Sequence, residues 1–333
     1  MNLVYACVFY NADYIRLLEL LLLSLRFYSK MGFDILILTS EGFHDRILGL
    51  SQRFSIPLRV HCLPCTTIFE AACARLHIFE WPELDKYTKL LYLDTDILIR
   101  RDLTPLFQID TEGLYGIPSG TLKSPHFGGQ FFDFSKTDAV TPGLNSGTLL
   151  FKNSTNIKNL FANILRHCSQ HTSSGKPLPY ALDQPFINYH AFTAGLCNTS
   201  VLKPYVSLYE DTLIVDNADT AMICHFSYPI GNFGHKYARM CEFFKGLLTT
   251  GGEGTLDLAG RRYTWDKGFL TFGEGIHTTW GIGSFTVLDS RTARVIWNGH
   301  EHVMRFTEDL GSYISVRIAP RDFNCVVGSL QTL

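Results

Sequence analysis

The chain begins with two apolar runs on either side of a helix-forming segment, and this pattern predicts a β-α-β unit. Leu3–Phe9 is a nearly continuous apolar run, as in a strand that is covered on both faces. Residues 15–28 are rich in helix formers, with Asp13 in front as a possible N-cap and Gly32 behind as a terminator. The run DILILTS, residues 34–40, predicts a second buried strand. Such a unit places the chain in the α/β class.

The alternation continues along the first 248 residues. Strands are predicted at 57–63, 89–93, 146–151 and 220–226, and helices at 70–79, 157–168 and 181–192. The segment 105–142 is loosely patterned, and its Gly, Pro and Ser content predicts a long loop of the kind that often carries function. We therefore expect a Rossmann-like, mixed and mostly parallel sheet that is flanked by helices.

The composition and hydrophobic pattern of the sequence change after Gly246. Residues 246–260 are typical of a linker, and the short apolar runs that follow alternate with Gly and Asp turns, which predicts a small all-β module. The predicted division is thus a domain at 1–248 and a β-rich accessory module at 249–333. Three of the four tryptophans lie in this module, together with His277 and His300, and they admit two interpretations. They either form a sugar-stacking surface or, as burial statistics favour, fill the core of a small β-sandwich.

Composition excludes several classes of protein. The net charge of −2 at pH 7 gives no basic footprint for a nucleic-acid partner. The nine cysteines are scattered, and Cys62 and Cys65 have no second pair at zinc-site spacing, so free thiols in a reducing compartment are expected. The apolar run YIRLLELLLLSL is short and interrupted by charges, which predicts a buried helix rather than a signal peptide or membrane span. We expect a cytoplasmic protein; the sequence leaves its oligomeric state open.

Two acids, Asp94 and Asp96, follow the apolar residues LLYL at the carboxyl end of a predicted strand. Open α/β sheets bind their ligands at this edge. In an extended segment residues i and i+2 point the same way, so both carboxylates would face one spot and Thr95 would face away. Two converging anions are costly unless a cation lies between them, and oxygen ligands of this kind suit Mg²⁺ or Mn²⁺. The alternative is a solvated turn or a helix cap.

The acids belong to an ordered set of motifs that resembles the glycogenin-like retaining glycosyltransferases, family 8, which have the GT-A fold. The set consists of Asp94-x-Asp96, Asn145-Ser146-Gly147, Asp183-Gln184 and His225, and the likeness extends over about residues 1–240. This resemblance implies a metal-dependent transfer of a hexose or related sugar from a nucleotide sugar, with a UDP-sugar as the expected donor, to a glycan or other hydroxyl acceptor. It also implies retention of configuration and a Mn²⁺ or Mg²⁺ cofactor.

The resemblance implies a role for each matching position. Asp94, Asp96 and His225 fall on the metal ligands, and Asp183 and Gln184 fall beside the anomeric carbon as the catalytic pair. The implied donor-binding set comprises Tyr10, Asn11, Tyr14, Arg75, Asp94, Thr95, Asn145, Ser146 and Lys236.

General chemistry agrees with these roles. A cation with a Lys or Arg stabilises charge on a departing diphosphate, and a carboxylate such as Asp183 stabilises an oxocarbenium-like sugar. Each residue also has a structural alternative: His225 as a buried histidine, Asp183 as a helix cap, Asn145-Ser146 as a turn, and the tyrosines as core aromatics.

The chain departs from the family pattern in two places. The family reads His-Phe-x-Gly-x-x-Lys after its last core strand, whereas here eleven positions separate His225 from Lys236, so His235 competes with Lys236 for the diphosphate. Tyr180 stands where the family often has Asp, so the donor sugar is not inherited.

Two rival functions remain at this point. The first is a sugar nucleotidyltransferase, which would require a Gly-rich phosphate loop after the first strand. The second is a glycan-binding protein with a decayed transferase domain.

Overall fold

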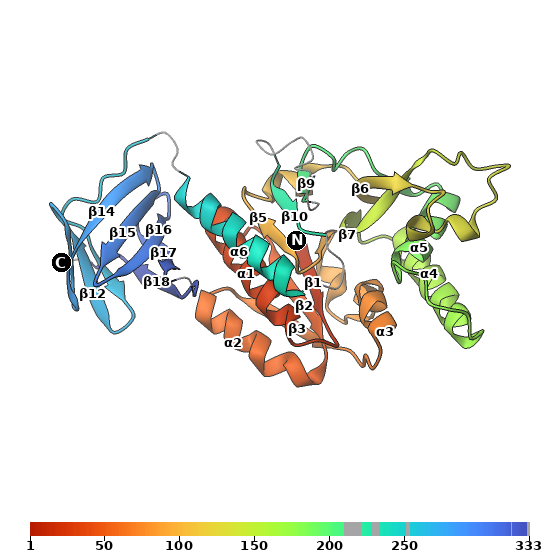
Figure 1. The fold of residues 1–333 in the computed structure, drawn as a ribbon, viewed down its shortest axis with the longest axis horizontal. Helices are drawn as coiled ribbons and strands as arrows, with labels where there is room; N and C mark the ends of the chain where they lie inside the picture. Colours follow the sequence, from red (N-terminus) through yellow and green to blue (C-terminus); the bar gives the residue numbers. More distant parts are fainter. Residues whose placement is uncertain (210–220, 228–232, 251–253, 321, 332–333) are drawn as a thin grey trace.

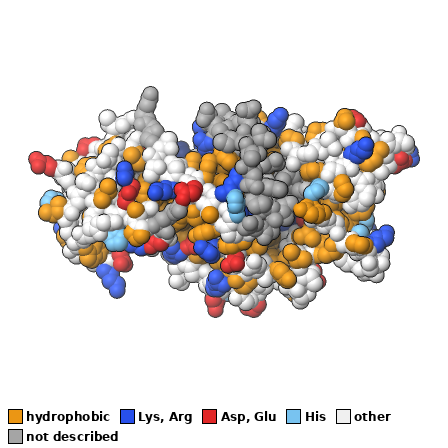
Figure 2. Space-filling view, viewed as in Figure 1, with side chains coloured by type: hydrophobic (Ala, Val, Ile, Leu, Met, Phe, Trp, Pro, Cys, Tyr) orange, Lys and Arg blue, Asp and Glu red, His pale blue; other side chains and the backbone are white. Residues whose placement is uncertain are grey.

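The computed structural model describes residues 1–209, 221–227, 233–250, 254–320 and 322–331. An α/β part occupies the centre and right of Figure 1, and an all-β part lies at the left. Over the described part of the face in Figure 2, basic and acidic side chains are interspersed among hydrophobic ones. No helix within the described residues is both long enough and apolar enough to cross a membrane.

A seven-stranded mixed sheet forms the centre, in the order β3-β2-β1-β4-β7-β6-β8. Its strands are β1 (Asn2–Val8), β2 (Asp34–Thr39), β3 (Leu58–Cys62), β4 (Lys89–Leu93), β6 (Leu114–Thr121), β7 (Pro142–Lys152) and β8 (Cys197–Asn198). The strands from β3 to β4 run parallel, and β7 runs antiparallel to both of its neighbours. The α/β class and the β-α-β start predicted from the sequence are thereby confirmed.

Helices cover both faces of this sheet. They are α1 (Tyr14–Tyr28), α2 (His44–Phe54), α3 (Ile68–Cys73), α4 (Thr155–Ser173), α5 (Gln184–Thr193) and α6 (Phe233–Thr249), with short 3-10 helices that include η2 (Ala74–Glu80), η4 (Thr104–Gln108) and η5 (Pro125–Phe127). Residues of β1 alternate between the two faces: Val4 and Ala6 join the core under α1, α2 and α6, whereas Leu3 and Tyr5 join the core under α4 and α5. Two apolar layers therefore sandwich the sheet.

A second, three-stranded sheet extends from the end of β4. It consists of β5 (Ile97–Ile99), β10 (Ile223–His225) and β9 (Val206–Leu208), in the order β5-β10-β9. The two acids follow the predicted strand as expected, but not in an extended segment: the chain leaves β4 at Leu93, turns through residues 94–96 and enters this other sheet as β5. One apolar segment thus contributes β4 to the first sheet and β5 to the second, and the two acids lie in the turn between these strands.

Two further expectations need correction. The long loop predicted at 105–142 contains η4 and the eight-residue strand β6, whose antiparallel pairing with β7 satisfies a backbone that the local Gly and Pro content does not favour as strand. The sequence does not predict the helix α6, at 233–249, because the Gly residues near its end are typical of a linker and not of a helix. Its apolar face packs Met240 and Phe244 into the core beside α1.

The C-terminal part is an antiparallel meander of eight strands. They are β11 (Arg262–Trp265), β12 (Gly268–Phe272), β13 (Ile276–Thr278), β14 (Gly281–Asp289), β15 (Thr292–Trp297), β16 (His300–Phe306), β17 (Ser312–Ala319) and β18 (Cys325–Ser329). A bridge between Tyr263 and Leu330 joins the first strand to the last, so the sheet closes on itself. The all-β class is confirmed, but the expected sandwich is wrong, since one closed sheet encloses the core.

The outer face of this meander packs against the α/β part. Val303, Ile314 and Val316 belong to the same apolar cluster as α1, α2 and α6, and the ring of Phe323 lies 5.6 Å from that of Phe244. The guanidinium of Arg305 lies over the rings of Phe27 and Tyr28 on α1. The two parts therefore share a core, and the division at 248 and 249 stays a prediction.

Candidate active site

The turn between β4 and β5 presents two carboxylates. Asp94 leaves β4 and Asp96 precedes β5, with the side chain of Thr95 buried between them. The two acids converge through this turn, and not through the extended geometry that the sequence suggested. The carboxylate of Asp94 is part-exposed, whereas that of Asp96 is nearly buried, so the pair lies at the boundary between core and solvent.

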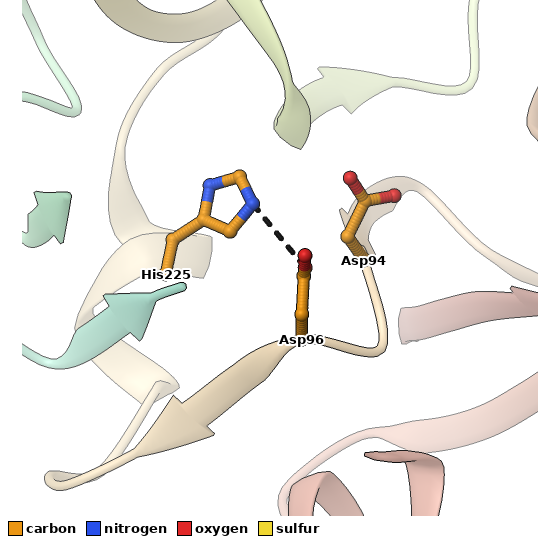
Figure 3. Close-up of side chains that lie close together, drawn as sticks. All are labelled: Asp94, Asp96 and His225. Carbon is orange, nitrogen blue, oxygen red and sulfur yellow. Dashed lines mark ion pairs between the residues drawn. The ribbon is translucent and has the colours of Figure 1, made fainter. Parts of the chain in front are cut away.

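His225 reaches the same place from the end of β10. Because β10 pairs antiparallel with β5, with His225 opposite Ile97, the imidazole comes next to Asp96. Its Nε2 atom lies 3.3 Å from Oδ1 of Asp96, the pair drawn in Figure 3. One donor atom from each of Asp94, Asp96 and His225 lies within 4.8 Å of the others. The structure thus brings together the three predicted metal ligands, from two segments that are far apart in sequence.

Gly147 forms one wall of this cluster. A Cβ atom at this position would lie 2.3 Å from Cε1 of His225 and 2.7 Å from Oδ2 of Asp94. Its carbonyl also accepts a hydrogen bond of 2.8 Å from the backbone N–H of Asp94. The sequence analysis gave Gly147 no role, although it belongs to the NSG motif; only the tertiary contact shows that the site requires glycine here.

Lys236 enters the cluster from α6. Its Nζ atom donates a hydrogen bond of 2.5 Å to Oδ2 of Asp96, and its side chain is buried. Burial by itself raises the pKa of Asp96, but Lys236 and His225 outweigh it and hold that pKa below its usual value. Asp96 is therefore ionised and ready to act as a ligand at neutral pH. The longer spacing after His225 does not prevent Lys236 from reaching the site; part of that spacing, 228–232, lies outside the described residues.

Arg75 links the acids to the rest of the site. Its guanidinium lies 3.2 Å from Oδ1 of Asp94 and 3.0 Å from Oδ2 of Asp183, and donates a hydrogen bond of 2.7 Å to the carbonyl of Ser146. It also stacks over the ring of Tyr92, 4.6 Å from the centroid. The phenol of Tyr92 donates a hydrogen bond of 2.5 Å to Asp94, a partner that the sequence analysis missed because Tyr92 resembles an ordinary strand aromatic.

Asp183 is almost fully buried where α5 begins. It does not cap the helix through its side chain. Burial raises the pKa of its carboxyl to about 6, against the opposing charge of Arg75. The Asp183–Arg75 contact is an ion pair rather than a well-aligned hydrogen bond, since Oδ2 of Asp183 has no hydrogen-bond partner within the described residues. A buried acid with a shifted pKa beside a cation cluster is typical of a reaction centre.

The amide of Gln184 holds neighbouring loops together. Its Oε1 accepts hydrogen bonds from the N–H and hydroxyl of Ser146, and its Nε2 donates to the carbonyl of His126. Asn145 uses its Oδ1 to accept from the N–H of Gly147, at 2.9 Å. These side chains fix the NSG turn beside Arg75. Tyr180, where the family often has Asp, is exposed and its ring lies 4.6 Å from that of His126.

The predicted nucleotide-binding residues lie at the same edge of the sheet. Because β1 and β4 are parallel neighbours, the segment after β1 lies beside the turn of Asp94 and Asp96. Tyr10 is 62% exposed and has a φ of 63°, and Asn11 is exposed next to it. A bulky residue held exposed in the left-handed region is uncommon, and such strain occurs at functional sites. Tyr14 lies near Lys236, Asp96 and Asp94, whose charges act on the pKa of its phenol after burial has raised it.

A divalent cation fits this cluster. Within the described residues, Oδ1 of Asp96 is buried without a hydrogen-bond partner, and Nε2 of His225 lies 3.3 Å from it. Two carboxylates and an imidazole are a donor set suited to Mn²⁺, and Mg²⁺ accepts the carboxylates equally well. The absence of a side chain at Gly147 keeps the space between Asp94 and His225 clear. The residues that would hold the ion are thus in place.

Comparison with known proteins agrees with this site. Residues 68–192 match the family model described as glycosyl transferase family 8. This segment includes Arg75, the two acids, the NSG turn and Asp183. A comparison with curated proteins gives no match.

Several solved structures are similar to parts of this chain at low sequence identity. Mouse xyloside xylosyltransferase 1 is 14% identical, with 69% of this chain and 100% of that chain covered and a TM-score of 0.49. An active-site mutant of LgtC is 16% identical, with 73% and 96% covered and a TM-score of 0.49. The bifunctional glycosyltransferase WbbM is 15% identical, with a TM-score of 0.47; the match covers 68% of this chain and 45% of WbbM.

Proposed function

We propose that the chain is a member of glycosyltransferase family 8, whose model residues 68–192 match, and that it moves a sugar from a UDP-sugar to a hydroxyl of a glycan, with retention of configuration. The observation that carries the proposal is the convergence of Asp94, Asp96 and His225 on one point at the carboxyl edge of the sheet. Lys236 adds a buried positive charge at the same point. This arrangement matches what the departure of a nucleoside diphosphate requires.

The leaving-group side of the site handles negative charge. When bound, Mn²⁺ or Mg²⁺ held by the two acids and His225 would stabilise the charge that builds on the diphosphate. Lys236 is the protein's own cation for the same purpose, and its hydrogen bond to Asp96 keeps the ammonium oriented in the cleft. Arg75 holds the carboxylate of Asp94 in place and positions it relative to Asp183. Tyr10, Asn11 and Tyr14 would supply rings and an amide for the uridine, and Thr95, in the turn between β4 and β5, would contribute to the same donor site.

The sugar side of the site has a single buried carboxylate. Asp183 would stabilise positive charge on the sugar ring, with Gln184 fixing the turn that faces it. Asn145 and Ser146 would contact the sugar hydroxyls. In this proposal residues 1–248 perform the transfer and residues 249–333 are an accessory module.

A nucleotide-release assay tests the transfer. The protein is incubated with UDP- and GDP-sugars, with Mn²⁺ or with EDTA, and the released diphosphate is measured. We expect metal-dependent release from a UDP-sugar, which Asp96→Ala reduces by about 10³-fold or more because a ligand is lost. Asp45→Ala, at an acid whose side chain is fully exposed on α2, is the matched control and leaves the rate unchanged.

The other outcomes separate the rival functions. No metal-dependent release from any donor would overturn the transferase proposal and leave the glycan-binding alternative. Formation of a nucleotide sugar from a sugar phosphate and a nucleoside triphosphate would identify a nucleotidyltransferase. The anomeric configuration of the product, read by NMR, tests retention: a β-linked product from an α-linked donor contradicts it.

A further inference from the structure

The closed meander has a pocket at one end, where β11 meets β12 and β15 meets β16. Its volume is about 320 Å³, at the lower end of the roughly 300–1,000 Å³ that small-molecule sites occupy. The lining includes Trp265, Trp280 and Trp297, all three tryptophans of this part of the chain. The pocket belongs to the all-β part at the left of Figure 1, whereas the Asp94, Asp96 and His225 cluster lies where β4, β5 and β10 meet, in the centre.

Two of the tryptophans form a rigid floor. Trp265 and Trp297 are 6% and 7% exposed, and their rings meet edge to face with centroids 4.8 Å apart. His302 stacks on Trp297 at 4.7 Å and is held by Ser315, 3.1 Å from its Nδ1 atom. Trp265 and Trp297 are therefore core residues, as one interpretation of the sequence predicts. Their packing also forms the base of a pocket. His277 does not line it.

The third tryptophan stands at the rim. Trp280 is 45% exposed, between β13 and β14, and its carbonyl accepts a hydrogen bond of 2.9 Å from Nδ2 of Asn298. Its ring edge comes so close to Gly268 that a Cβ there would lie 2.7 Å from Cη2. The indole of Trp280 is thus held against the backbone of the β11–β12 hairpin, although nearly half of the residue faces solvent. A large apolar ring that is both exposed and positioned in this way is suited to contact with a ligand.

Polar side chains complete the lining. Asp266, Asn298 and Asn324 offer carbonyl and carboxylate acceptors and amide donors, and Arg317 is paired with Asp322. Two nitrogens of the Arg317 guanidinium contact the carboxylate of Asp322, which balances the Arg317 charge, while Asp266 disfavours an anionic ligand. A purely apolar ligand would offer no partner to the amide of Asn324 or to the oxygens of Asn298 and Asp266, which is unfavourable in a pocket.

From this combination we infer that the pocket binds a sugar residue of a glycan. A pyranose ring has an apolar face that packs on an aromatic ring and an edge of hydroxyls that exchange hydrogen bonds with amides and carboxylates. Trp280 provides the aromatic face, and Asn298, Asn324 and Asp266 provide partners for the hydroxyls. This inference goes beyond the proposed transfer reaction, because it assigns a second carbohydrate site to a part of the chain that carries none of the transfer residues.

Titration of the full chain with free sugars tests the inference. D-glucose, D-galactose, N-acetyl-D-glucosamine, lactose and maltose are added at millimolar concentration in EDTA without nucleotide, and binding is followed by saturation-transfer NMR and calorimetry. We expect at least one of them to bind, and Trp280→Ala to weaken that binding about tenfold or more. Trp280→Phe should keep most of the affinity, because it retains an aromatic face.

A matched control and a second variant make the result decisive. Ile282 is 72% exposed on β14, two residues from Trp280 and outside the pocket, so Ile282→Ala should bind like the unmodified protein. Asp96→Ala should also bind sugar normally, which separates this site from the transfer site. The inference is overturned if none of the five sugars binds, or if Trp280→Ala leaves the affinity unchanged.

Discussion

The Nζ atom of Lys236 lies 2.5 Å from Oδ2 of Asp96, although the two residues are 140 positions apart in the sequence. One comes from the first buried turn of α6 and the other from the turn that links the two sheets of the α/β part. The contact places a buried cation directly beside the candidate metal ligands. It also explains how the buried carboxylate of Asp96 remains ionised in a largely apolar surrounding, because Lys236 and His225 lower its pKa.

The first prediction concerns Lys236. Replacing it by Met removes the charge while keeping much of the volume, and we expect turnover to fall by about 10²–10³-fold, as when a preorganised donor to developing charge is lost. Lys245→Met on the same helix should leave turnover unchanged. Steady-state kinetics with the donor identified in the release assay would measure both. Equal rates for the two variants would contradict a role for Lys236 at the diphosphate.

Gly147 provides a test of the geometry of the metal cluster. Gly147→Ala places a methyl group 2.3 Å from Cε1 of His225, so either the imidazole or the strand must move. We expect a loss of Mn²⁺ affinity of at least about tenfold, with destabilisation of about 1–3 kcal/mol from overpacking. Calorimetric titration with Mn²⁺ and thermal unfolding would measure these effects. Unchanged Mn²⁺ affinity would show that the ion is bound elsewhere.

Gly49 provides the contrasting substitution. It is an exposed position in the interior of α2, with no atom within 4 Å of a Cβ built there. Gly49→Ala should therefore stabilise the protein by about 0.5–1 kcal/mol through helix propensity, and leave Mn²⁺ binding and turnover as they are. Denaturant unfolding would measure the gain. A destabilised variant would show that α2 does not have the exposed surface described.

The pH dependence of turnover should follow the protonation of the Asp183 carboxyl group. Burial raises its pKa to about 6, so in the proposed reaction turnover should fall as the pH decreases through about 6 and the carboxylate becomes protonated. Because this pKa is above its ordinary value, the folded state binds the extra proton. The contribution of Asp183 to stability therefore decreases as the pH rises from about 4 to 6. Asp183→Asn should abolish turnover and remove this part of the pH dependence of unfolding; a variant that keeps full activity would exclude Asp183 from the reaction.

His302 should change the pH dependence of stability in the opposite direction to Asp183. Burial lowers its pKa to about 3, with Arg317 adding to the effect, so the folded state keeps the imidazole neutral. The unfolded chain binds a proton below about pH 6.5, and stability is therefore lost as the pH falls from 6.5 toward 3, by up to a few kcal/mol. His302→Gln should reduce this acid sensitivity, whereas His277→Gln, at an exposed position, should not. Thermal unfolding at pH 7 and pH 4.5 would measure the difference.

Much of the α/β part could be predicted because its signals are local. The alternation of apolar runs with helix formers predicts the β-α-β start, and the place of Asp94 and Asp96 after an apolar run puts them at the ligand-binding edge. Predictions failed where pairing with a distant segment overrides local preference. The extended geometry predicted for Asp94 and Asp96 is replaced by a turn because β5 pairs with β10, and β6 forms within a Gly- and Pro-rich segment because β7 lies beside it.

The sequence by itself determined the α/β class, the β-rich end of the chain and the residue types available for a cation and a diphosphate. Tertiary structure alone decided that Gly147 must lack a side chain, that Arg75 joins Asp94 to Asp183, and that Lys236 reaches Asp96. It also decided that the last eight strands close on themselves and form a pocket beside three tryptophans. The physical reason is range: strand and helix preferences depend on neighbours in the chain, whereas contacts between charges and the fit of side chains depend on segments that only folding brings together.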